Sequence, residues 1–142
     1  MKKYYSAVIF CLLFLALNGC ARLTEPFKIL WGSSMKALEE ARPNASVSTF
    51  QCREEECFRQ VLSIAKENHL TVFTSDPKKP LIVLMGFTGS INTTEVGVFF
   101  SEIEPNKTKV EIVSLSPTAQ EIATKLLTGQ LKKTFTELHG NP

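Results

Sequence analysis

The first 20 residues are the feature that most constrains this chain of 142 residues. They open with Met1-Lys2-Lys3, continue in an unbroken apolar run from Ala7 to Leu17, and end in Asn18-Gly19-Cys20. A helix that crosses a bilayer needs about 20 apolar residues, and this run is about half that length. A basic start, a short apolar core and a small residue before a cleavage point instead predict an export signal that is removed from the mature chain.

Leu17-Asn18-Gly19-Cys20 resembles the lipobox of bacterial lipoprotein signal peptides. Leu17 stands at the third position before the cut and Gly19 directly before it, whereas Asn18 departs from the small or β-branched residue that is usual there. The resemblance implies cleavage before Cys20, so that residues 1–19 are removed, and acylation of Cys20 by chains such as palmitate. Two or more chains anchor a protein stably. Ala21 after the cysteine implies the outer membrane, facing the periplasm. The alternative is an ordinary secretory signal that contains a cysteine.

The charge balance argues against a nucleic-acid partner. The whole chain has a formal net charge of +2, but Lys2 and Lys3 leave with the signal and no acidic residue does. The mature chain is therefore formally neutral, whereas nucleic-acid-binding proteins carry a basic excess on one face. We expect the membrane, reached through the lipid on Cys20, and a protein of the cell envelope as partners.

Cys52 and Cys57 remain as an even pair in an oxidising compartment. Their Cα atoms would be about 8.5 Å apart in one helix and about 16 Å apart in one strand, too far for a disulfide in either case. A bond therefore needs a strand-to-helix corner, and the acidic residues 54–56 suit the first turn of a helix. The alternative is a redox-active pair or a metal site. The spacing is not Cys-x-x-Cys, and neither His69 nor His139 lies in a ligand pattern. We expect a disulfide, no metal and no cofactor.

Residues 20–45 are predicted to hold the lipidated cysteine and a juxtamembrane helical tether, with the helix from Glu25 to Ala41. Apolar side chains recur along it at helical spacing, foremost Phe27, Leu30 and Trp31. Two interpretations stay open: the stripe contacts the lipid interface or a partner, or it packs on its own domain. The sequence Trp-Gly-Ser-Ser, followed by Ala-Leu-Glu-Glu-Ala-Arg, resembles segments of small uncharacterised envelope lipoproteins of bacteria. This resemblance implies no activity.

Residues 46–138 are predicted to form one α+β domain, with 139–142 as a tail. Alternating or continuous apolar runs predict strands at 47–50, 70–74, 81–85, 96–103 and 108–115. Helical spacing predicts a helix at 54–68, and Ser116-Pro117 opens a last helix whose apolar stripe runs to Leu138. The order β-α-β-β-β-β-α predicts an antiparallel sheet of four to five strands with helices packed on one face. It is similar to the helix-grip domains of outer-membrane assembly lipoproteins, a likeness of element order that carries no function.

No catalytic constellation is recognisable, because the sequence has no local nucleophile signature and no glycine-rich phosphate loop after a strand. We therefore expect a non-enzymatic envelope lipoprotein that binds another protein, as an accessory or assembly factor. Its binding surfaces would be the tether helix and an open sheet edge. The alternative is a carrier or sensor of an apolar ligand held between the sheet and the C-terminal helix, around Phe87, Phe99, Phe100 and Phe135.

Overall fold

The computed structural model describes the backbone of residues 34–138 and the side chains of residues 34–136. Within this range a compact unit begins at Ala37. Helical residues 37–41 lead into a short 3-10 helix, η1 (Arg42–Asn44). The elements that follow are β1 (Ser46–Phe50), α3 (Glu54–Glu67), β2 (Thr71–Asp76), β3 (Leu81–Met85), β4 (Val96–Glu104), β5 (Lys107–Ser114), α4 (Pro117–Thr134) and β6 (Glu137–Leu138).

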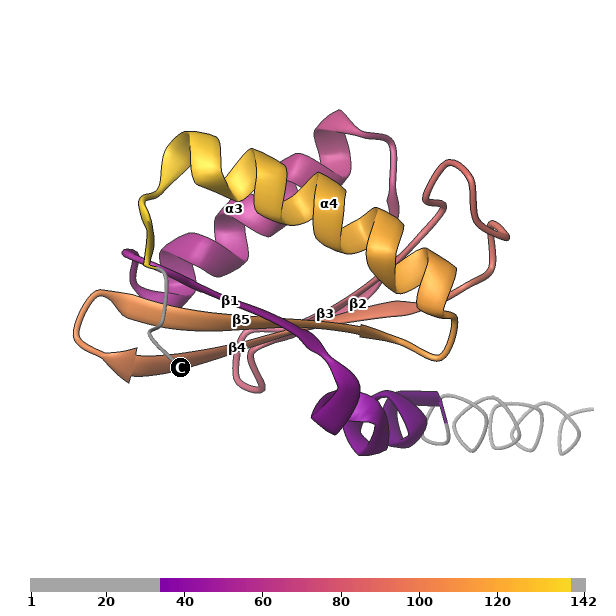
Figure 1. The fold of residues 1–142 in the computed structure, drawn as a ribbon, viewed down its shortest axis with the longest axis horizontal. Coiled ribbons are helices and arrows are strands. Elements are labelled where there is room, and N and C mark those ends of the chain that lie inside the picture. The colour runs from indigo at the N-terminus through magenta and orange to yellow at the C-terminus, as the bar shows by residue number, and fades with distance from the viewer. Residues whose placement is uncertain (1–33, 139–142) are drawn as a thin grey trace, which may run out of the picture. The chain divides into compact units, whose positions relative to one another are not determined.

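The strands form one antiparallel sheet in the order β2-β3-β4-β5-β1-β6. Helices α3 and α4 cross over the same face of this sheet (Figure 1). The α+β class, the predicted element order and the packing of helices on one face are therefore confirmed. The two-residue strand β6 is added at the end of that order.

The main core lies between the sheet and the two helices. Alternate residues of the central strands point toward α3 and α4, namely Val96, Val98 and Phe100 of β4 and Val110 and Ile112 of β5. Leu81–Leu84 of β3 are all buried, so this strand is covered on both faces, as its continuous apolar run predicts.

The opposite face of the sheet carries a smaller apolar cluster where the chain enters the domain. A Cβ atom added to Gly97 would lie 3.4 Å from Cδ1 of Leu38, which is itself buried. The Arg42 guanidinium lies over the ring of Phe99, 4.6 Å from its centroid, and forms an ion pair with Glu111. Residues that the sequence prediction gave to the tether thus pack on the domain.

Helix α4 begins as its sequence predicts, because the Ser116 hydroxyl accepts a hydrogen bond from the Ala119 N–H at 3.3 Å. The prediction that this helix runs to Leu138 is wrong in its last turn. The helix ends at Thr134, and residues 137 and 138 pair with Phe50 and Thr49 as β6. The edge of β1 has backbone N–H and C=O groups without a strand partner, and pairing with residues 137 and 138 satisfies some of them.

Helix α3 ends in a turn that redirects the chain into β2. The N–H of Leu70 donates to Ala65 O at 2.9 Å and that of His69 to Lys66 O at 3.2 Å. This is a Schellman motif, in which the left-handed position belongs to His69 with φ 54°.

Candidate functional site

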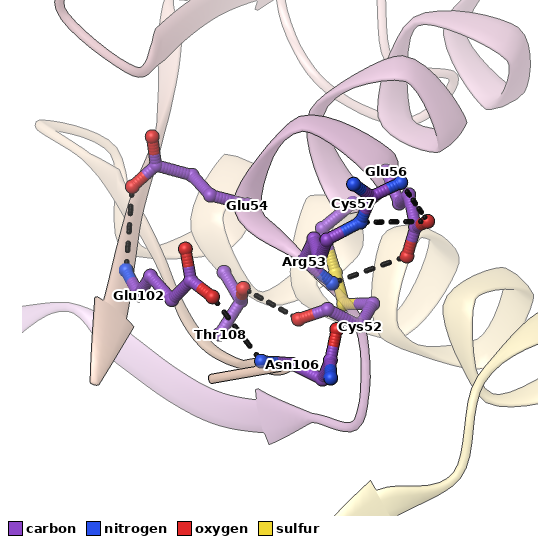
Figure 2. Close-up of a disulfide and its surroundings, with 8 residues drawn as sticks. All are labelled: Cys52, Arg53, Glu54, Glu56, Cys57, Glu102, Asn106 and Thr108. Carbon is purple, nitrogen blue, oxygen red and sulfur yellow. Dashed lines mark hydrogen bonds and ion pairs between the residues drawn. A yellow bond between two sulfur atoms is a disulfide. The ribbon is translucent and has the colours of Figure 1, made fainter. Parts of the chain in front are cut away.

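The corner between β1 and α3 is closed by a disulfide from Cys52 to Cys57, whose Cα atoms are 6.1 Å apart (Figure 2). The bond lies at the corner that the cysteine spacing predicts. Both residues are buried, and the Thr108 hydroxyl of β5 donates to Cys52 O at 2.8 Å. The disulfide therefore ties the start of α3 to the sheet.

The acidic residues at this corner accept hydrogen bonds from nearby backbone and arginine N–H groups. Glu56 accepts from the Arg53 N–H at 3.2 Å and from the Arg53 guanidinium at 2.8 Å. These bonds hold the pKa of Glu56 below its usual range and raise the pKa of Arg53. Glu54 accepts from the Glu102 N–H at 3.3 Å, as Figure 2 shows.

Glu102 and Glu104, two acidic residues of β4, do not come together as a pair of cation ligands. A register irregularity separates the two residues, and Glu104 pairs with Lys107 at 3.0 Å. Among the described residues, no group of three or more His, Cys, Asp or Glu side chains is placed to hold a metal ion.

Three of the four aromatic residues suggested for an apolar cleft belong to the main core or pack against it, and Phe99 does not. Phe100 points toward the helices, where its ring packs 5.5 Å from that of Phe58. Its neighbour Phe99 lies on the opposite face of the sheet, under Arg42. Phe87 is buried in the main core, and Phe135 packs against that core from its periphery.

A groove of about 520 Å³ lies between α4, the end of α3 and the loop after β3. We call it the α3–α4 groove. Its apolar lining comes from Leu70, Phe87, Ile122 and Leu126, and its charged lining from Lys125 and Lys133. The sequence prediction did not single it out. Its only local signal is a glycine, Gly129, in the middle of an amphipathic helix that also carries these two lysines.

A larger depression, of about 710 Å³, lies beside the start of α4. The Gln120 side chain lines it, donating to Asn44 O at 2.8 Å and accepting from the Ser114 N–H at 3.0 Å. Its charged lining, Glu121 and Lys125, has both signs. These hydrogen bonds join α4 to the sheet and to the entering chain, so the Gln120 side chain has a structural role.

Strand β2 is a sheet edge. It pairs with β3 on one side, and no strand of the described residues pairs with its other side. A β-bulge between Val72 and Thr74 bends it. Val72 is 40% exposed, and the charge of this strand is confined to Asp76 at its end.

The remaining predicted site residues lie outside the described part of the chain. They are Cys20, Phe27, Leu30 and Trp31. Between residues 34 and 138, no helix is long and apolar enough to cross a membrane.

At the start of β4, burial raises the pKa of the Glu95 carboxyl.

Comparison with known proteins leaves function to be argued from the chain itself. No protein-family model and no curated protein matches this sequence. The fold defines an α+β domain.

Proposed function

We propose that this protein is a non-enzymatic lipoprotein of the bacterial envelope, anchored in the outer membrane through Cys20 and facing the periplasm. There it binds another envelope protein as an accessory or assembly factor. The anchor rests on the lipobox-like sequence that ends at Cys20. The binding role rests on the open edge of β2.

An open strand edge presents unpaired N–H and C=O groups, to which a partner can add a strand. Proteins usually protect such edges with Lys, Pro or a bulge. Strand β2 has no Lys, Arg or Pro from Thr71 to Asp76, and its protection is the bulge beside Val72. A partner strand has to match this bend, which favours a specific partner over indiscriminate pairing.

The test uses the full-length lipidated protein in its own membrane, with a photo-crosslinking residue in place of the exposed Ser75. We expect an adduct with one protein partner. Val72→Lys should abolish that adduct, because a lysine on an edge strand opposes strand addition. Val47→Lys makes the same change at a side chain that is 56% exposed on β1, toward the other end of the sheet, and should leave it intact.

Two results would count against strand addition. One is the absence of a protein adduct at Ser75 while the fold is intact. The other is an equal loss of the adduct in Val72→Lys and Val47→Lys, since that would be an effect of added charge and not of the β2 edge.

A further inference from the structure

The α3–α4 groove has a one-sided charge pattern. Its polar lining consists of lysine, amide and hydroxyl groups, and it contains no Asp or Glu. Among the described side chains, those of residues 34–136, neither Lys125 nor Lys133 has an ion-pair partner. An apolar surface beside two unpaired cations is complementary to a ligand that is apolar on one side and acidic at its margins.

Gly129 leaves the middle of the groove uncovered. A Cβ atom added there would meet no atom within 4 Å, so the fold has no steric need for glycine at this helical position. Glycine in a helix interior is destabilising relative to alanine. The glycine does give an incoming ligand close access to the α4 backbone.

We infer that the α3–α4 groove binds an amphipathic helix of a partner protein, with its apolar stripe on Ile122 and Leu126 and its carboxylates beside Lys125 and Lys133. The inference rests on the proposed binding function and names the chemistry of one partner element. The two lysines are eight residues apart on α4, about 12 Å along its axis, so the partner helix carries acids about two turns apart.

A helix fits this groove better than a small apolar ligand does. Small-molecule sites enclose most of the ligand's surface. This groove is open to solvent, and about half of its lining residues are polar. An open groove with cations at its margin instead matches the recognition of a helix that keeps one face in water.

The experiment uses the full chain in detergent and two synthetic helical peptides of about four turns. Both peptides carry the same leucine stripe, flanked by glutamates in one and by lysines in the other. Fluorescence anisotropy should show that the acidic peptide binds about tenfold more tightly, a preference that weakens as salt is raised. The double variant Lys125→Glu/Lys133→Glu should reverse the order of the two peptides.

Gly129 supplies a matched pair of variants. Gly129→Leu should abolish binding of the acidic peptide because its side chain projects into the groove, whereas Gly129→Ala should retain most of it. Circular dichroism checks that both variants are folded. Equal affinity for the two peptides, or binding that survives Gly129→Leu, would overturn the inference.

The groove inference and the proposal of strand addition at β2 can be contradicted independently of each other. Val72→Lys should leave peptide binding unchanged. If the peptides do not bind while the Ser75 adduct persists, the groove inference fails and the proposed function stands. If the acidic peptide binds in a Lys125- and Lys133-dependent way but no adduct forms at Ser75, strand addition fails and the groove remains.

Discussion

Gly97 shows how one residue permits packing on the sheet face opposite the helices. A Cβ atom there would lie 3.0 Å from Cε2 of Phe99 and 3.4 Å from Cδ1 of Leu38. We expect Gly97→Ala to destabilise the protein by about 1 kcal/mol, because overpacking outweighs the smaller gain from a stiffer unfolded chain. Urea unfolding measures the change.

The control for Gly97 is the same substitution where nothing obstructs it. Gly129→Ala should stabilise the protein by about 0.5–1 kcal/mol, since its Cβ meets open space in the helix α4. If both alanine variants are stabilised alike, Leu38 and Phe99 adapt freely and the close packing at Gly97 has no energetic consequence.

Glu56 gives the corner a predictable response to acid. Its pKa is lowered by the side-chain hydrogen bond from Arg53 first and by the Arg53 backbone N–H second. A depressed folded-state pKa stabilises the fold above the unfolded pKa of about 4.3, and this stabilisation is lost as the pH falls through the folded value. Glu56→Gln should therefore lower stability at neutral pH.

The measurement for Glu56 is a series of urea midpoints from about pH 7 to pH 3, a range that spans the titration of ordinary glutamates. The gap between wild type and Glu56→Gln should close at the acid end. Glu55→Gln is the control, because its ion pair with Arg59 is 3.8 Å long and both side chains are well exposed. A gap that stays constant with pH would show that the ionised carboxylate is not the cause.

At the scale of the element, the disulfide fixes the start of α3 against the sheet. The double variant Cys52→Ala/Cys57→Ala should lose about 2 kcal/mol of stability, the value expected for so short a loop. Both cysteines are almost fully buried, so a reductant should reach them only after unfolding. Urea titration with and without reductant, followed by thiol labelling, measures both effects. Rapid labelling of the folded protein would contradict this burial.

Elements whose signals are local could be predicted from the sequence. The apolar run from Leu81 to Met85 is a strand with those bounds, and Ser116-Pro117 starts α4 as its capping preference requires. The Cys52–Cys57 spacing likewise constrains a corner that involves few residues. In each case the interactions that determine the local structure lie within one helical turn or one strand of the residues that predict it.

Elements that depend on distant parts of the chain could not be predicted in this way. The apolar spacing of α4 continues to Leu138, yet the last residues pair with Phe50, far away in the sequence. The Arg42 guanidinium lies over the ring of Phe99. The residue pattern within β4 gives no indication of this contact. The α3–α4 groove needs three segments together, so its residues, such as Leu70 and Ile122, carry no joint signal in one stretch.

At the scale of the whole molecule, the two faces of the sheet have different roles. The chain enters on one face, where Leu38 packs beside Gly97 and Arg42 lies on Phe99. The α3–α4 groove belongs to the other face, where Figure 1 shows the two helices.

Processing at Cys20 and the state of the other thiols can be tested together. We expect the membrane-extracted protein to have the mass of a chain that begins at Cys20 and carries acyl groups. Its Cys52 and Cys57 should resist alkylation until a reductant is added. Intact mass spectrometry, with and without reductant and alkylating agent, measures both. Cys20→Ala should remain uncut and lack the acyl mass, which gives the control.

An uncut chain would contradict both the lipid anchor and the proposed compartment. An uncut chain with both thiols free would place Cys52 and Cys57 in a reducing compartment, where structural disulfides are rare. The corner would then rely on the Thr108 and Arg53–Glu56 hydrogen bonds without the covalent bond. A cut, lipidated chain with blocked thiols instead sets the folded domain at a membrane surface in an oxidising compartment. The β2 edge and the α3–α4 groove should then be tested against proteins of the envelope.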